Sequence, residues 1–165
     1  MRVTNENTGR RSFLKVMGAT GAVVAAAGAG LMKPAKSLAA NFPFPKEAFD
    51  KESLSSAMQA ALGTTNVQEA NVSLKAPTIA ENGAVVPITA SSDMGSKVAK
   101  FHIFVEKNPA PYTARFHMLD TGRAEVSTRI KMGETSNIIA VAETTDGSFY
   151  KATKEVRVTI GGCGG

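Results

Sequence analysis

The feature that most constrains the fold is a series of short segments, from residue 70 onwards, in which apolar and polar residues alternate. Such alternation is typical of strands that bury one face, and the Gly, Pro, Asn and Asp residues between the segments indicate turns. The segments are VSLKAP, AVVPITAS, KFHIFVEK, YTARFHML, AEVSTRIKM, SNIIAVAET and FYKATKEVRVTI. About seven strands at this spacing predict a mainly β fold, an immunoglobulin-like antiparallel β-sandwich. The cysteine pair and tryptophan of antibody domains are missing, because the chain has one cysteine and no tryptophan.

Two positions in these segments carry more specific predictions. Asp146-Gly147 lies between two strand-like segments and predicts a tight β-hairpin. Pro87 lacks the amide hydrogen that a ladder of strands uses. Its strand is therefore expected at the edge of a sheet, or with a bulge at this residue.

One helix is expected before the strands, over residues about 46–62. Leu54, Met58 and Leu62 recur at helical spacing, and Gly63 follows as a natural stop. The helix would have an apolar face that must be covered. Its own domain or another subunit could cover that face, and the sequence leaves both alternatives open.

Residues 1–39 have the pattern of an export signal. Arg10 and Arg11, followed by the letters SFLK, resemble the motif of a bacterial twin-arginine signal. The apolar run over residues 16–32 is too short and too rich in glycine to favour a membrane-spanning helix. Cleavage is expected after Ala39, so we expect the mature chain in the periplasm.

The basic character of the chain belongs to this signal. The whole sequence has a formal net charge of +5. Residues 1–39 hold six Lys or Arg and one Glu, a net charge of +5, so the remainder is formally neutral. A nucleic-acid-binding function loses its electrostatic support once the signal is removed.

The single cysteine, Cys163, lies in the C-terminal sequence GGCGG. A structural cysteine has packed neighbours or a second cysteine, and Gly161, Gly162, Gly164 and Gly165 supply neither. Glycine makes this segment thin and conformationally free, so we expect a flexible arm. Five residues extend roughly 17 Å, which places the thiol up to roughly 10 Å beyond the last strand.

We therefore divide the chain into a signal, a carrier domain over residues 40–160 and an arm over residues 161–165. Ile160 is expected to be the last residue that faces the core. The arm has no histidine or cation that would lower the pKa of a thiol, so Cys163 is better suited to carry a group than to catalyse a reaction. An unpaired cysteine in an oxidising compartment indicates intermolecular pairing or a reactive thiol.

Other candidates for chemistry have simpler interpretations. His102 and His117 lie in strand-like segments and are interpreted as structural residues, although the sequence does not decide whether either touches the arm. Arg123, Arg129 and Lys131 could line a path for anions, but alternating charges are usually the solvent-facing side of a strand. One cysteine and two separated histidines do not make a metal site, and no cofactor is expected.

The sequence resembles the SoxY family, the Y subunit of the sulfur carrier in the Sox thiosulfate-oxidation system. The resemblance rests on the terminal V-x-V-T-I-G-G-C-G-G and the twin-arginine signal. The stretches ENGAVVPITA, IFVEKNPAPYTARFHM and STRIKMGETSNIIAVAETTDGSFYKA also resemble the family, so the resemblance covers essentially the whole mature chain. The GGCGG terminus is its specific element.

The resemblance implies a periplasmic carrier, not an enzyme, that holds sulfur intermediates covalently on Cys163. It also implies a heterodimer with the Z subunit. A haem-containing complex would load thiosulfate, a hydrolase would release sulfate, and a sulfane dehydrogenase could act in some pathways. Two other functions for the same thiol stay open: an exported redox protein that cycles the cysteine, and a binding domain linked to a second copy by a disulfide.

Overall fold

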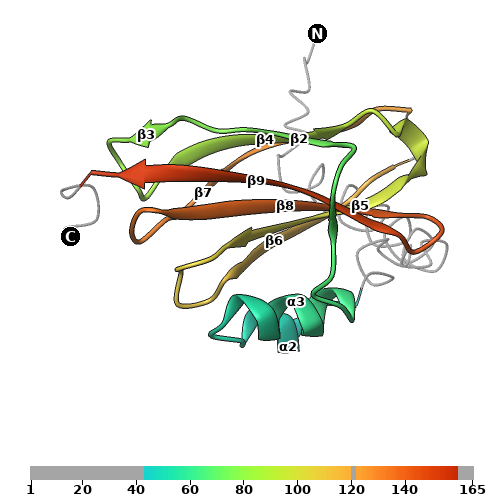
Figure 1. Ribbon diagram of the computed structural model, residues 1–165, viewed down its shortest axis with the longest axis horizontal. Helices are drawn as coiled ribbons and strands as arrows, with labels where there is room; N and C mark the ends of the chain where they lie inside the picture. The colour runs from blue at the N-terminus through green and yellow to red at the C-terminus, as the bar shows by residue number, and fades with distance from the viewer. Residues whose placement is uncertain (1–42, 120–121, 160–165) are drawn as a thin grey trace, which may run out of the picture. The chain divides into compact units, whose positions relative to one another are not determined.

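The computed structural model describes residues 43–119 and 122–159. Across these ranges the chain forms two β-sheets and two short α-helices (Figure 1). The larger sheet has the order β1 (Gln68–Glu69), β9 (Phe149–Val158), β8 (Ser136–Thr144), β5 (Val98–Val105) and β6 (Tyr112–His117), with β3 (Ile79–Ala80) also paired to β9. The smaller sheet has the order β2 (Val72–Lys75), β4 (Val86–Ser92) and β7 (Ala124–Ile130). The helices are α2 (Lys46–Phe49) and α3 (Leu54–Leu62), and a 3-10 turn, η2 (Gly95–Lys97), precedes β5.

The two sheets pack face to face and enclose the main core. Aliphatic and aromatic side chains from β4, β5, β7, β8 and β9 meet there, and most of them are completely buried. They include Val86, Ile88, Phe101, Ile103, Val105, Ile130, Ile138, Ala140 and Val156. The main core lies between two sheets of mostly antiparallel strands, as the immunoglobulin-like sandwich predicts.

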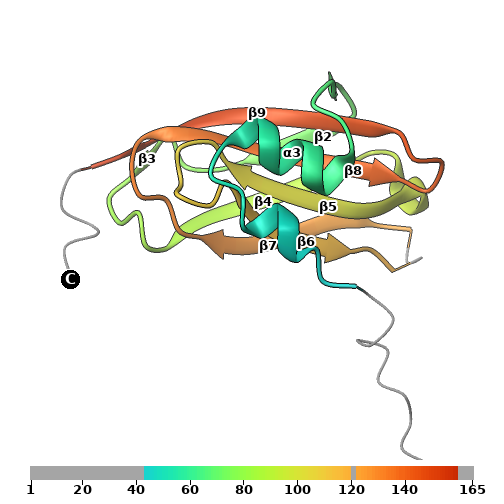
Figure 2. The same ribbon diagram turned by 90° about the horizontal axis from the view of Figure 1, so that it is seen from below.

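The opposite face of the larger sheet is covered by α2 and α3 (Figure 2). A second apolar cluster fills this layer, with residues from both helices and from β5, β6 and β8. Its buried members are Ala48, Ala57, Met58, Leu62, Val67, Phe104, Tyr112, Ile139 and Val141. The central strands β5 and β8 are thus buried on both faces, which explains their nearly continuous apolar runs IFV and IIAVA. The apolar face of the predicted helix therefore packs on its own domain.

The predicted single helix over residues 46–62 is two helices. The first ends at Phe49, with Asp50 as its C-cap. Ser53, the N-cap of the second, takes an extended conformation, with φ −117° and ψ 145°. The Ser53 hydroxyl accepts a hydrogen bond from the backbone N–H of Ser56, an N-cap that starts a new helix in place of continuing the old one. Gly63 ends α3 in the left-handed conformation, at φ 74°, as the sequence predicts.

The seven predicted segments are the seven longer strands, β2 and β4 to β9. The predicted hairpin at Asp146-Gly147 joins β8 to β9, and Gly147 has a φ of 83°, which favours glycine. Two further strands, β1 and β3, have two residues each and carry no alternation that a sequence could reveal. Within the described ranges, no helix is long and apolar enough to span a membrane.

The prediction for Pro87 is wrong. Its strand, β4, is the middle strand of the smaller sheet. The pairing with β7 runs from Val86 to Ser92 without a shift in register, so there is no bulge. The other neighbour, β2, pairs only with the segment from Thr89 to Ser92. Pro87 is tolerated in a middle strand because it lies beyond the end of β2, where one side of β4 is open.

Candidate functional site

The residues predicted to carry the function lie outside the described ranges. These are Cys163 with Gly161, Gly162, Gly164 and Gly165, together with Ile160 and the signal residues Arg10 and Arg11. The structure describes the segment that leads to the cysteine, the end of β9 as far as Thr159. We refer to the last three described residues, Arg157, Val158 and Thr159, as the arm root.

One edge of the arm root is held by β3. The register pairs Ile79 with Arg157 and Ala80 with Val158 in parallel. The backbone N–H of Arg157 donates to the carbonyl oxygen of Thr78 at 3.0 Å, and that of Thr159 donates to the carbonyl oxygen of Ala80 at 3.1 Å. The two-residue strand β3, together with Thr78, thus provides the hydrogen-bond acceptors along one edge of the arm root.

The other edge of the arm root is held by the residue before β8. Pairing between β8 and β9 reaches Ser136 opposite Val156 and stops there. The hydroxyl oxygen of Thr135 then accepts a hydrogen bond from the backbone N–H of Val158 at 3.0 Å. The chain is therefore held on both edges as far as Val158, and on the β3 edge as far as Thr159, four residues before Cys163.

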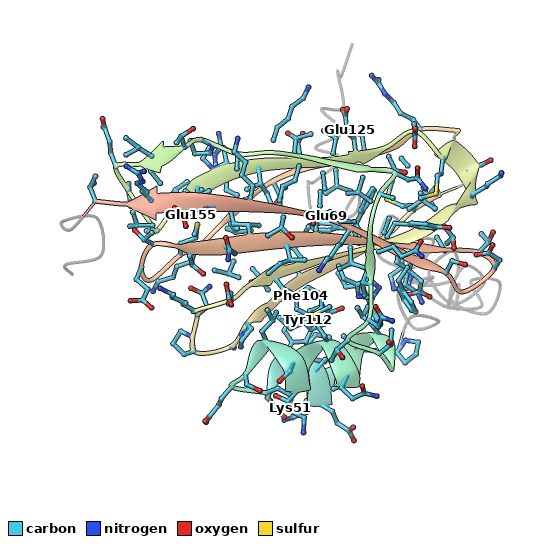
Figure 3. The ribbon with its side chains drawn as sticks, in the orientation of Figure 1. Lys51, Glu69, Phe104, Tyr112, Glu125 and Glu155 are labelled. Atoms are coloured by element: carbon cyan, nitrogen blue, oxygen red, sulfur yellow. The ribbon has the colours of Figure 1, made fainter. Side chains whose placement is uncertain are left out.

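The surface around the arm root is mixed in character. Ile79, which pairs with Arg157, is a large apolar residue with an exposed fraction of 54%. Arg157 and Glu155 alternate with buried Val156 and face the solvent, and Figure 3 shows Glu155 on β9 near this end. Thr159 is exposed, and its hydroxyl donates to the carbonyl oxygen of Glu81 at 3.3 Å. The root therefore lies at an open part of the surface.

Both histidines are far from this root. His102 pairs with Val141 of β8, and Val141 pairs with Lys151 of β9. Lys151 precedes Thr159 by eight residues, which is about 26 Å along a strand. The chain from Thr159 to Cys163 spans at most about 14 Å. A histidine of the same chain therefore does not reach the thiol, and this holds also for His117, which lies further along the sheet.

His102 is instead the centre of a hydrogen-bonded group, which we refer to as the polar cluster: Lys100, His102, Tyr112 and Glu143. His102 and Tyr112 are buried, whereas Lys100 and Glu143 are partly exposed. The Nδ1 atom of His102 lies 2.8 Å from the Tyr112 hydroxyl, and its Nε2 atom lies 2.9 Å from a carboxylate oxygen of Glu143. The other carboxylate oxygen of Glu143 accepts a hydrogen bond from Lys100 at 2.5 Å. His102 has an exposed fraction of 1%.

The polar cluster changes the proton affinities of its members. The hydrogen bond from His102, together with Lys100, lowers the pKa of Glu143 to about 2. Burial lowers the pKa of His102, against the opposing effect of Glu143. Burial also raises the pKa of Tyr112 above its usual range. At neutral pH the cluster therefore contains an ionised Glu143, a neutral His102 and a neutral Tyr112.

His102 is a buried strand residue with both ring nitrogens hydrogen-bonded, as its structural interpretation predicted, but its partners were not predictable from the sequence. Arg123, Arg129 and Lys131 are exposed, as expected for the solvent-facing side of strands. No three His, Cys, Asp or Glu residues within the described ranges are grouped so that they could hold a metal ion. The contacts of the arm root were also missed, because β3 and Thr135 show no pattern along the chain.

The family model and one solved structure indicate the same family. The family model for sulfur oxidation protein SoxY matches residues 58–163, a range that includes Cys163. The solved structure of the sulfur carrier protein SoxY from Chlorobium limicola f thiosulfatophilum is 36% identical, with a TM-score of 0.57. That alignment covers 68% of this chain and 97% of the Chlorobium chain. A superoxide reductase (neelaredoxin) from Ignicoccus hospitalis aligns at 12% identity and a TM-score of 0.47, over 55% of this chain and 81% of its own. No curated protein sequence matches.

Proposed function

This chain belongs to the SoxY family of sulfur oxidation proteins and is a sulfur carrier of that family, and we propose that Cys163 holds the sulfur covalently. The observation that carries the proposal is the family match, which runs through the strand of the arm root to the single cysteine of the chain. The hydrogen bonds on both edges of the arm root support it, since they fix the position from which the thiol is presented.

The loading step is an oxidation. The thiol of Cys163 and thiosulfate form a sulfur–sulfur bond, which gives a cysteine thiosulfonate, one proton and two electrons. A haem-containing partner accepts the two electrons. Water then cleaves the bond between the outer sulfane sulfur and the sulfonate sulfur, which releases hydrogen sulfate and leaves a persulfide on Cys163. The outer sulfur of this persulfide is the cargo of later steps.

The chain acts in these steps as a covalent scaffold, and the partners catalyse them. A thiol needs a neighbouring base or cation to become a strong nucleophile near neutral pH. His102 is about 26 Å along the strands from Thr159, the last residue of the arm root, and both of its ring nitrogens are already hydrogen-bonded. Activation of Cys163 therefore falls to the active site of the partner that receives the arm.

The proposed location is the periplasm, and the proposed stable partner is a Z subunit. Arg10 and Arg11 in a twin-arginine pattern support export of residues 40–165 after removal of the signal. The family supports the heterodimer. Sedimentation of the mature chain with and without the Z subunit tests the heterodimer. A mature chain that stays a stable monomer and does not bind the Z subunit would contradict it.

Accurate mass spectrometry of the protein from cells growing on thiosulfate tests the carrier function. We expect thiosulfonate and sulfane sulfur adducts on the peptide that contains Cys163. Accurate mass is needed because one sulfur atom and two oxygen atoms have the same nominal mass. Oxygen adducts alone would indicate a redox protein, and disulfide-linked dimers alone would indicate a linked binding domain.

A further inference from the structure

The polar cluster joins three neighbouring strands on the face of the larger sheet that the helices cover. Tyr112 comes from β6, His102 from β5 and Glu143 from β8. Tyr112 also belongs to the apolar layer beneath the helices, where its ring lies 4.5 Å from that of Phe49 in α2 and 5.0 Å from that of Phe104. Figure 3 shows Tyr112 and Phe104 between the sheet and the helices. One side chain thus connects the cluster to the helical layer.

The positions of the protons in the cluster follow from its charges. Glu143 is ionised, since its pKa is lowered to about 2, so it accepts a hydrogen bond from the Nε2–H of His102. A neutral imidazole with its proton on Nε2 has an acceptor at Nδ1. The hydroxyl of Tyr112, which keeps its proton, therefore donates to Nδ1.

A second proton on His102 would change this arrangement. The Nδ1 atom would become a donor and would face the hydroxyl hydrogen of Tyr112, so this hydrogen bond must break or reverse its direction. The new positive charge would lie near the cations Lys100 and Arg115 and near His117, against the single carboxylate of Glu143. Burial of the ring would add to the cost of the charge.

The consequence differs between the two layers of the protein. Tyr112 packs with the residues of α2 and α3, and none of the buried side chains between the two sheets belongs to the polar cluster. Phe49, which touches Tyr112, also stacks on the exposed Phe44 with centroids 5.0 Å apart. Loss of the contact at Tyr112 would therefore act on the helical layer before it acts on the sandwich.

We propose that the attachment of α2 and α3 to the larger sheet is controlled by protonation of His102, so that acid releases the helices while the two-sheet core stays folded. The Tyr112 hydroxyl is the connecting group. The helices lie flat on the sheet when His102 is neutral, and they open locally when it carries a second proton. The device is part of the carrier domain and does not depend on the chemistry of Cys163.

Nuclear magnetic resonance of the full-length chain tests the proposal, because the sequence contains two histidines. A His117→Gln variant assigns the ring signals of His102 without removing any member of the cluster. We expect the ring of His102, the methyl groups of Met58 and Leu62 in α3, and the amide exchange of α3 to share one midpoint below pH about 6.5. After correction for the intrinsic exchange rate, opening of α3 should rise by up to about tenfold per pH unit below pH about 6.5 until His102 is protonated in the closed state.

Two variants separate the connecting group from a general effect of acid. Tyr112→Phe removes the hydroxyl that is hydrogen-bonded to Nδ1 of His102, so it should strongly weaken the pH dependence of the opening of α3. Tyr150→Phe, which alters the other tyrosine of the chain, should preserve the behaviour of the parent. The proposal is overturned if His102 titrates without a response in α3, if Tyr112→Phe leaves the pH response of α3 intact, or if the core amides of β4 exchange at the same midpoint.

Discussion

The arm root and the polar cluster lie towards opposite ends of the larger sheet and are held by different kinds of interaction. Around Val158 and Thr159 the contacts are backbone hydrogen bonds to β3 and one bond to the Thr135 hydroxyl. Around His102 they are side-chain bonds between ionisable groups. The first region presents a surface segment that is held mainly by backbone groups, whereas the second joins ionisable side chains around the buried His102 and responds to protons.

Because of this difference, we expect the two ends of the larger sheet to serve different purposes: one presents the arm, and the other contributes to stability. Backbone bonds at the arm root do not titrate between neutral and acidic pH, so the position from which Cys163 is presented should be insensitive to acid. The hydrogen bonds of the polar cluster, in contrast, depend on the protonation of its side chains, and these lie beside the helical layer. Changes at Cys163 and its flanking glycines should therefore alter sulfur transfer with little effect on unfolding, and changes at the cluster should do the reverse.

The largest expected effect is on function alone. A Cys163→Ser variant should lose sulfur-dependent turnover completely, because no other thiol exists in the chain. Its free energy of unfolding should stay within about 0.5 kcal/mol of the parent, because no side chain is expected to pack on Cys163. Thermal unfolding and thiosulfate oxidation by a strain without other carriers measure the two quantities. Substantial turnover in that strain would contradict the assignment of Cys163.

A second change at the same end tests why glycine surrounds the thiol. Val at Gly162 and Gly164 would restrict the backbone and thicken the chain beside the sulfur. We expect loading by the haem-containing partner to slow by at least about tenfold, which corresponds to about 1.4 kcal/mol in the barrier. A small thiol reagent should label Cys163 nearly as fast as in the parent and serves as the control. Undiminished loading would show that the glycines do not serve access to the partner.

At the other end of the sheet, the free energy of unfolding should fall in acid. The pKa of His102 is lowered in the folded state, so the unfolded state binds more protons below pH about 6.5. Stability from this residue is therefore complete above that pH and decreases as the pH falls towards the folded pKa. Glu143, with its pKa lowered to about 2, adds a second loss between pH 4.5 and about 2.

Denaturant titrations at several pH values measure this dependence, and Glu143→Gln is the informative variant. It should lower the free energy of unfolding at pH 7 by roughly 1–3 kcal/mol, because the bonds from His102 and Lys100 lose their charged acceptor. It should also remove the loss between pH 4.5 and about 2. Sulfur loading of Cys163 at pH 7 should not change. A variant as stable as the parent at pH 7 would refute the role of the cluster in stability.

The sequence predicted much of the fold because alternation is a local property. Seven segments with that pattern became the seven longer strands, and even β5 and β8, buried on both faces, were recognisable by their β-branched and apolar runs. The break between α2 and α3 was missed, since Ser53 has the N-cap bond only once the chain turns there. Pro87 was misplaced because the length of β2, which decides whether a neighbour is present, is not encoded around the proline itself.

The candidate site likewise has one part that the sequence predicts and one part that it does not. The candidate thiol was evident from composition, as the single cysteine among four glycines, and it stays a prediction because it lies outside the described ranges. The polar cluster was not predictable, because 41 residues separate His102 from Glu143 in the chain and only the strand register brings them together. The same reason applies to Thr135, whose bond to Val158 bridges 23 residues.

The smallest expected effect concerns the arm root itself. Replacing Thr135 by Val keeps the shape of the side chain but removes the oxygen that accepts the N–H of Val158 at 3.0 Å. We expect the free energy of unfolding to fall by about 1 kcal/mol, the usual net contribution of one hydrogen bond. Because β3 still holds the other edge at Arg157 and Thr159, loading of Cys163 should slow by less than about threefold.

Thr153→Val is the matched control. Thr153 is an exposed threonine earlier in β9, and its replacement should change neither the free energy of unfolding nor the rate of loading. Faster amide exchange at Val158 in the Thr135 variant alone would confirm that this bond holds the root, and equal exchange in the two variants would show that β3 is sufficient.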